Sequence, residues 1–259
     1  MPPRALRPSG LFLIDKEAGR SSFAVVASVR ARTGARTGHA GTLDPFATGL
    51  LLVLSGSSTK LVPWLVGLDK RYLSDIDLSA RSSTGDPEGE IVAQHDPPPP
   101  EELEERLEAL RGEVELPVPA ASAVKIGGER AYRLHRRGIA VEMPLRRSRI
   151  DALDVIAYTN GVATLDLRVS SGTYVRAVAE AIGGHCRTLR RLEVGPFSVE
   201  QADPERVLPP AEAVGFLATI EVTPIRAADL RTGREHGLED ARYVLGGELV
   251  AVGRTVMPW

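Results

Sequence analysis

The chain has 259 residues, 43% hydrophobic and 25% charged, so it can bury a large core as one sizeable domain with room for a small second one. Its longest apolar run, 49–54, is far shorter than the roughly 20 residues that cross a bilayer, and its first ten residues lack an apolar signal core. We therefore expect a cytoplasmic protein without membrane contact. The only cysteine, Cys186, excludes intrachain disulfides and Cys-rich zinc sites, and the five histidines show no HExxH spacing, so we expect no metal.

The predicted elements mix strands and helices without a regular βαβ alternation. The first part of the chain has a strand at 10–15, a helix at 23–32, a structured loop at 36–49, a strand at 50–54 and a short helix at 58–66. The middle part has a strand at 72–78, a turn at 84–89, a helix at 101–111, a strand at 123–126 and a basic helix at 129–137. The last part has a hairpin of 149–158 with 162–169, a helix at 173–182 and a last hairpin near 246–247. This mixture predicts an α+β fold, and we place a domain boundary near residue 222.

Charge is divided among segments, although the whole chain has a net charge of -2. Residues 1–80 contain 10 basic and 6 acidic side chains, 81–118 contain 3 and 11, 119–199 contain 13 and 7, and 200–259 contain 6 and 10. Two basic segments separated by an acidic one would suit a face that binds a polyanion. Ordinary fluctuation with solvated helices explains the same pattern equally well.

The loop at 36–49 is the most unusual stretch, because its glycines permit tight turns while it presents one imidazole, His39, and one carboxylate, Asp44. Asp44 is therefore a candidate for covalent or acid/base chemistry. Alternatively, it caps a helix that starts at Pro45. The loop lacks the Gly-Lys-Ser/Thr of a Walker phosphate cradle, which argues against a nucleoside triphosphate site.

Two further segments carry candidate groups. The arginine of SGTYVR, Arg176, follows a glycine and a hydroxyl at a predicted helix start and could orient a carboxylate; it could equally be an ordinary surface arginine. Lys70, Arg71 and Tyr72 suit phosphate contacts plus base stacking, although a strand tyrosine is more often part of the core. Other basic side chains could follow an RNA backbone or simply be solvated, and they are Lys60, Lys125, Arg130, Arg133, Arg136, Arg137, Arg146, Arg147 and Arg149.

Several motifs occur in an order that matches one known family. Asp15-Lys16 with Gly19 and Ser22 is similar to DKPxGxTS, and GHAGTLDPFATG at 38–49 is similar to GHxGTLDPxATG. KRY at 70–72, STGDPEG at 83–89, SAVKIGGERAYRLHRRG at 122–138, SGTYVR at 171–176 and VGPF at 194–197 complete the series. From about Gly10 to Phe197 the chain resembles the TruB family of tRNA pseudouridine-55 synthases.

The resemblance implies a fold and a domain division. We expect the pseudouridine-synthase α+β fold over 1–222, with a mixed, mostly antiparallel sheet flanked by helices. Residues 223–259 are shorter than a full PUA domain, the small RNA-binding module common in relatives, so we expect a truncated PUA-like module there. The chain departs from the family pattern at Glu17, Ser21, Ala40 and His135, none of which removes a catalytic group.

The resemblance also implies roles for individual residues. Asp44 would be the nucleophile, Tyr72 would stack on the target base and help to remove its C5 proton, Arg176 would pair with Asp44, and His39 would contact the displaced T loop. Contacts with tRNA are expected from Lys60, Lys70, Arg71, Lys125, Arg130, Arg136 and Arg146, and support for the motif loops from Lys16, Gly38, Gly41, Thr42 and Gly172.

The implied partner is the T arm of tRNA, bound by a monomer without a cofactor or an obligate protein partner. Two rival functions remain open from the sequence. One is an RNA-folding protein without turnover, against which the intact Asp44, Tyr72 and Arg176 argue. The other is a glycosidase, for which the Asp44 loop offers no second carboxylate.

Overall fold

The computed structural model describes residues 9–235 and 238–253. Parts of the expected C-terminal module, 236–237 and 254–259, lie outside the described residues. Within the described residues, no helix is long and apolar enough to span a bilayer.

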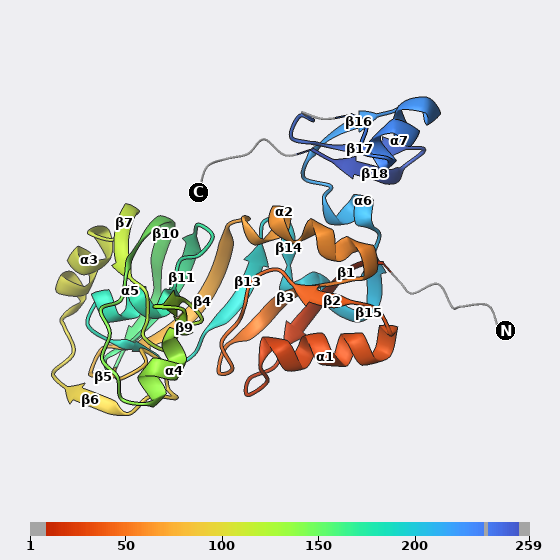
Figure 1. The fold of residues 1–259 in the computed structure, drawn as a ribbon. Helices are drawn as coiled ribbons and strands as arrows, with labels where there is room; N and C mark the ends of the chain where they lie inside the picture. The colour runs from red at the N-terminus through yellow and green to blue at the C-terminus, as the bar shows by residue number, and fades with distance from the viewer. Residues whose placement is uncertain (1–8, 236–237, 254–259) are drawn as a thin grey trace.

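One large mixed sheet forms the centre of the protein (Figure 1). Its main path runs in the order β15 (Asp203–Leu208), β1 (Gly10–Lys16), β3 (Thr48–Ser55), β13 (Arg190–Val194), β4 (Lys70–Asp77), β11 (Val162–Val169), β10 (Leu145–Thr159) and β7 (Gly112–Pro117). Three short strands join it at the side, and they are β2 (Thr37–His39), β12 (His185–Cys186) and β14 (Phe197–Ser198). All pairs are antiparallel except β13 with β3, which confirms the predicted mixed, mostly antiparallel sheet.

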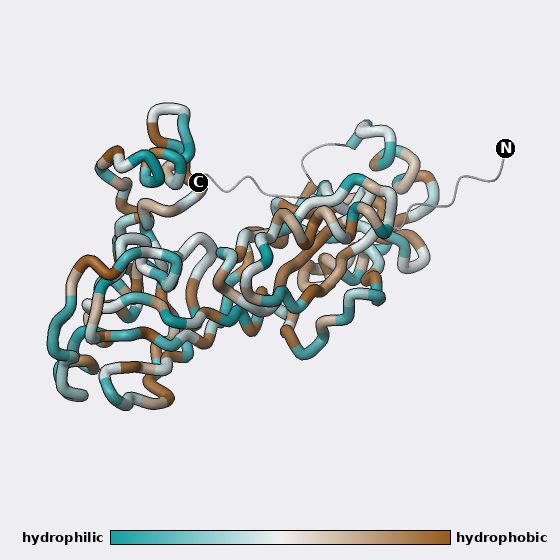
Figure 2. Tube along the Cα trace, turned by 90° about the horizontal axis from the view of Figure 1, so that it is seen from below, coloured by the Kyte–Doolittle hydropathy of each residue, from teal (hydrophilic) through white to brown (hydrophobic). Residues whose placement is uncertain are grey.

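Helices cover the two halves of this sheet on either side of β13. Helix α1 (Ser22–Thr33) packs on β2 and β3, and Ser21 caps it, because its hydroxyl accepts from Ala24 N at 3.1 Å. In the other half, α3 (Pro100–Glu108) and α5 (Val175–Ala181) pack beside the sheet (Figure 1). Strand β3 is buried along nearly its whole length, which agrees with its uninterrupted apolar sequence, and hydrophobic segments run through the middle of the molecule (Figure 2).

Several predicted elements differ in their bounds. The predicted helix at 58–66 is a 3-10 helix, Gly56–Leu61, followed by α2 (Val62–Val66), because Pro63 can occupy only the first turn of an α-helix. The predicted basic helix is only α4 (Ala131–Arg136). The residues expected to start this helix form strand β9 (Glu129–Arg130) instead, which pairs with β8 (Lys125–Ile126). A separate hairpin consists of β5 (Ala80–Ser82) and β6 (Ile91–Gln94).

A small C-terminal module has its own sheet and core. Strands β16 (Ala218–Glu221), β17 (Ala241–Leu245) and β18 (Glu248–Val252) form the sheet, and α7 (Pro224–Arg231) packs on it. Strand β16 belongs to this sheet, so the sheet starts four residues before the boundary that we predicted near residue 222. The linking segment contains the 3-10 turn Val199–Gln201 and α6 (Pro210–Ala213).

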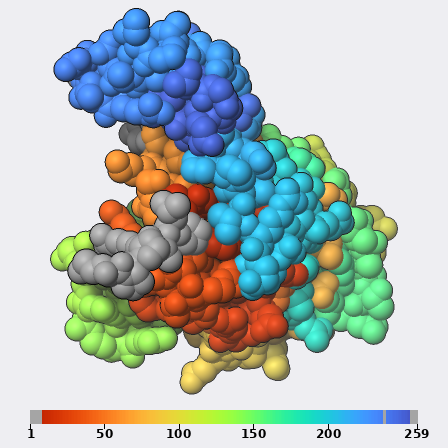
Figure 3. All heavy atoms as spheres, turned by 90° about the vertical axis from the view of Figure 1, so that its right-hand side faces the viewer, coloured from red at the N-terminus to blue at the C-terminus, as the bar shows by residue number. Residues whose placement is uncertain are grey.

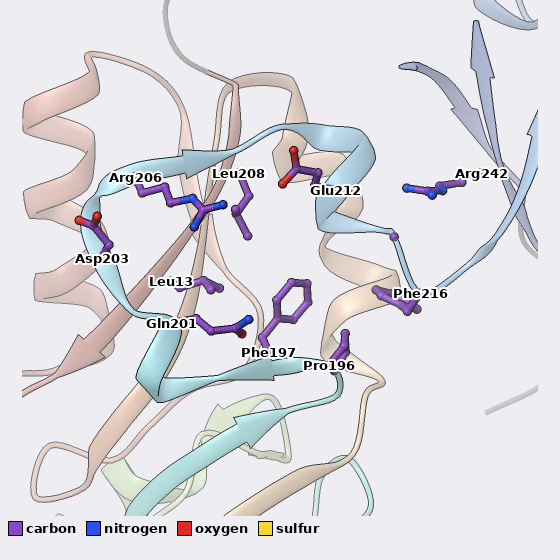
Figure 4. Close-up of a pocket in the computed structure, with 11 residues that line it drawn as sticks. Leu13, Pro196, Phe197, Gln201, Asp203, Arg206, Leu208, Glu212, Phe216 and Arg242 are labelled. Atoms are coloured by element: carbon purple, nitrogen blue, oxygen red, sulfur yellow. The ribbon is translucent and has the colours of Figure 1, made fainter. Parts of the chain in front are cut away.

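The module sits on the segment of about 200–217, as the space-filling view shows (Figure 3). Arg242 donates to the carbonyl of Ala211 at 2.7 Å, and the indole of Trp64 donates to the carbonyl of Gly253 at 3.2 Å. A cavity of about 450 Å³ lies at this junction, with Phe197 at its centre and Arg206, Glu212 and Phe216 around it (Figure 4).

Candidate active site

A cleft of about 830 Å³ opens where the two halves of the sheet meet. Its walls come from segments far apart in the chain: the loop of residues 41–45, here named the Asp44 loop, the start of β4, the turn at 83–90, helix α4, and residues 171–176. Asp44, Tyr72 and Arg176 all line it. The structure therefore brings the three predicted catalytic residues together.

Arg176 joins two carboxylates at the base of the cleft. Its Nε lies 3.0 Å from Oδ2 of Asp44, and its Nη1 lies 3.2 Å from Oδ2 of Asp86. The guanidinium also donates to the carbonyls of Thr84 at 2.8 Å and Ala121 at 3.1 Å. Only 2% of the Arg176 side chain is exposed, so the alternative of an ordinary surface arginine is wrong.

Asp86 is a site residue that the sequence did not single out. It lies in STGDPEG, which we interpreted as a turn and as one of the family motifs without a role for Asp86, and 4% of its side chain is exposed. Its Oδ1 accepts from the Thr84 hydroxyl at 2.6 Å and from Glu88 N at 3.0 Å. Asp86 is the second carboxylate that a glycosidase would need, but its oxygens act as acceptors for buried donors, which does not suit a general acid.

Residues of the motif that contains Lys16, Gly19 and Ser22 form hydrogen bonds with the Asp44 loop. The ammonium of Lys16 donates to the carbonyl of Pro45 at 3.1 Å, as does Gly19 N at 2.8 Å. The Ser22 hydroxyl donates to the carbonyl of Leu43 at 2.8 Å and accepts from its N–H at 2.9 Å. No helix starts at Pro45, so the alternative of Asp44 as a helix cap is wrong.

The first strand of the other half, β4, presents Tyr72 to the cleft. Side chains alternate along a strand, so Lys70 and Tyr72 face one side and Arg71 the other. Tyr72 is 8% exposed, packs in the main core and also lines the cleft, so the core interpretation is confirmed and stacking on a base stays a prediction.

Two predicted RNA contacts on β4, Lys70 and Arg71, stay predictions, because both side chains already have partners within the protein. The ammonium of Lys70 is buried and donates to the carbonyls of Val66, at 2.7 Å, and Leu68, and to the Ser171 hydroxyl, at 3.1 Å, which leaves no proton for a phosphate. Burial also lowers its pKa to about 8. Arg71 lies outside the cleft lining, where its guanidinium pairs with Asp166 at 2.6 Å and Glu193 at 3.0 Å.

The other predicted RNA contacts divide by position. Arg136 and Arg146 are exposed and line the cleft, and a side chain at Gly172 would collide with the guanidinium of Arg146. Lys60, Lys125 and Arg130 are exposed but lie outside the cleft lining. His39, on β2, is half-buried and also outside that lining; burial and then the charge of Arg191 lower its pKa.

The predicted motif residues also divide by position. Gly41 and Thr42 line the cleft within the Asp44 loop. Gly38 lies outside it on β2, opposite Leu54 of β3.

Comparisons with known proteins agree with this geometry. Residues 29–175 match the model of the TruB family pseudouridylate synthase N-terminal domain. A protein of Leifsonia xyli named tRNA pseudouridine synthase B is 39% identical over 250 residues, which are 87% of this chain and 83% of that protein. This chain belongs to the TruB family. A Ruegeria protein of the same name is 37% identical, over 95% of this chain and 91% of its own length.

Solved structures extend the TruB-family assignment to the fold. The chain superposes with a TM-score of 0.71 on a "Crystal Structure of a Cbf5-Nop10-Gar1 Complex", at 22% identity, covering 96% of this chain and 78% of that one. A "Structure of H/ACA RNP bound to a substrate RNA containing 2'-deoxyuridine" gives the same TM-score and coverage at 20% identity. The likeness and the family match confirm the pseudouridine-synthase fold.

The electrostatics of this TruB-family cleft predict a pH dependence. Burial raises the pKa of Asp44 above 3.8; Arg176 opposes the rise, Asp86 adds to it, and Lys16 opposes it. If the anion is the active form, kcat/KM should fall as pH drops through this raised pKa, at a higher pH than for an exposed aspartate. In Lys16→Met the fall should move to still higher pH, because an opposing charge is lost. A fall at the ordinary aspartate pKa in both proteins would contradict the expectation.

Proposed function

We propose that this chain isomerises the uridine at position 55 in the T loop of tRNA to pseudouridine, with Asp44 as the nucleophile. The observation that carries the proposal is the carboxylate of Asp44, 32% exposed in a cleft of about 830 Å³ and paired with a buried arginine. The ion pair favours the anion and fixes its direction, both of which a nucleophile requires. The relatives' name, tRNA pseudouridine synthase B, supports the same substrate.

The reaction makes limited chemical demands, which these residues can meet. Asp44 forms a covalent adduct with the nucleotide, the C1′–N1 bond breaks, the uracil turns, C5 bonds to C1′, and the bond to Asp44 breaks so that its carboxylate is regenerated. C5 then loses its proton while N1 gains one, so the product is an isomer and no redox equivalent is consumed. Tyr72 lines the same cleft and is our candidate to stack on the base and to assist removal of the C5 proton.

The substrate uridine must leave its stack to reach Asp44, at a cost of a few kcal/mol. Stacking on Tyr72 and phosphate contacts from Arg136 and Arg146 would offset that cost, since both arginines are exposed on the cleft wall. We propose that the protein acts as a monomer without an obligate partner and that the module from Ala218 onward is a PUA-like unit that adds RNA contacts.

The test is tritium release from tRNA transcript labelled with [5-³H]uridine, followed by mapping of the modified position. We expect stoichiometric release and a single pseudouridine in the T loop, without added metal or cofactor. Tight tRNA binding without release would replace this proposal with the non-catalytic RNA-folding function. Release of free uracil would instead indicate a glycosidase.

A further inference from the structure

Arg191 is a buried cation at the junction of the two half-sheets. It lies on β13, directly between Gly49 of β3 and Tyr72 of β4 in the strand register. A side chain at Gly49 would collide with the backbone of Arg191, so β3 and β13 can approach this closely only because position 49 is glycine. The residue is 1% exposed, yet it lines the cleft.

The guanidinium of Arg191 is directed at backbone carbonyls of the segment that carries the nucleophile. Its Nη2 donates to the carbonyl of Gly41 at 3.1 Å, its Nη1 to that of Thr42 at 3.4 Å, and its Nε to that of Leu50 at 2.7 Å. Within residues 9–235 and 238–253, no carboxylate forms an ion pair with it. Its neighbour Arg190 differs, because that side chain is 39% exposed and pairs with Asp15 at 2.7 Å.

Burial of a charge without a counter-ion costs free energy, which other polar groups must offset. For Arg191, the carbonyl dipoles of the Asp44 loop and β3 offset this cost. The charge also acts on neighbouring groups, because it contributes to the lowered pKa of Lys70 in the cleft and of His39 outside it. A guanidinium presents its donors in a rigid planar fork, so it fixes the directions of the carbonyls that it holds more firmly than an ammonium on a flexible stem does.

We propose that Arg191 is a positioning residue, which holds the carbonyls of Gly41 and Thr42 and thereby fixes the carboxylate of Asp44 relative to the ring of Tyr72. The proposal deepens the isomerase function and rests on it. Arg191 belongs to the strand that pairs with both β3 and β4. It therefore connects the loop that carries Asp44, on one half of the sheet, with Tyr72 on the other half. The role concerns the geometry of reaction more than the capture of tRNA.

The experiment compares Arg191→Lys and Arg191→Met with Arg190→Met as the matched control. Single-turnover rates, tRNA dissociation constants and amide hydrogen exchange of residues 41–44 in the free protein would be measured. We expect the Arg191 variants to react about 10²-fold more slowly, the loss typical of a small displacement of reacting groups, with tRNA affinity nearly unchanged. Exchange should accelerate in the Asp44 loop of these variants only, and Arg190→Met should behave as the native protein.

Several outcomes would overturn the proposal. They are an unchanged single-turnover rate in both Arg191 variants, a loss that follows tRNA affinity alone, and unchanged exchange at 41–44. If Arg191→Met does not fold, Arg191→Lys decides by the same measurements. A native protein without turnover would contradict the proposed function, whereas the exchange data report on the loop independently, so the two failures can be told apart.

Discussion

Asp44→Asn is expected to abolish pseudouridine formation while tRNA binding stays nearly unchanged. The substitution keeps the size of the side chain and an oxygen that can accept from Arg176, but it removes the anion that attacks the nucleotide. Removal of a nucleophile commonly lowers turnover by at least about 10⁴-fold. Tritium release would measure the loss, and filter binding of the same tRNA would measure the affinity.

Glu88→Gln is the matched control, because it removes a carboxylate from the same cleft at an exposed position, whereas the carboxylates paired with Arg176 are those of Asp44 and Asp86. We expect it to retain most of the activity. Substantial turnover by Asp44→Asn would remove the nucleophile assignment. An equal loss in both variants would point instead to a general electrostatic effect of the cleft.

Arg176→Met should lower the free energy of unfolding by about 3–5 kcal/mol, as well as turnover, because it leaves a buried carboxylate without its cation. The ion pair of Arg176 with Asp86 is the most buried in the described structure, with 2% and 4% of the two side chains exposed. Urea unfolding followed by tryptophan fluorescence would measure the change.

The double variant Arg176→Met with Asp86→Asn separates charge from packing. We expect it to recover part of the lost stability without recovering turnover, since it removes the uncompensated charge of Asp86. Arg149→Met is the control for an exposed pair, and it should cost about 1 kcal/mol or less, because 47% of its side chain and 47% and 36% of those of its partners Asp69 and Asp151 are exposed. A double variant no more stable than Arg176→Met would mean that the loss comes from packing.

The sequence predicted the parts of the site that depend on local chemistry. Glycines around a carboxylate predicted a structured loop at Asp44, and the family motifs predicted that Tyr72 and Arg176 would join it. Asp86 and Arg191 were missed because their importance arises from burial and from partners about 90 to 150 positions away. A single charged residue carries no local signal of such contacts.

Other features that the sequence did not predict have a common physical cause. They depend on contacts between segments far apart in the chain, which residue type alone does not reveal. Lys70 and Arg71 are residue types that suit a phosphate site. In the structure, however, carbonyl, hydroxyl and carboxylate oxygens of neighbouring segments accept their hydrogen bonds. Strand β16, just before the boundary predicted near 222, was not predicted, because it pairs in parallel with residues 23 positions later in the chain, beyond any local pattern.

The position of β13 has a consequence for synthesis of the chain. Residues 190–194 insert between strands that were made more than a hundred residues earlier, so the sheet cannot close until most of the polypeptide has left the ribosome. Until then, the edges of β3 and β4 that β13 will cover stay available to other chains. Nascent or shortened molecules that end before Arg190 should therefore be more prone to aggregate than the finished protein.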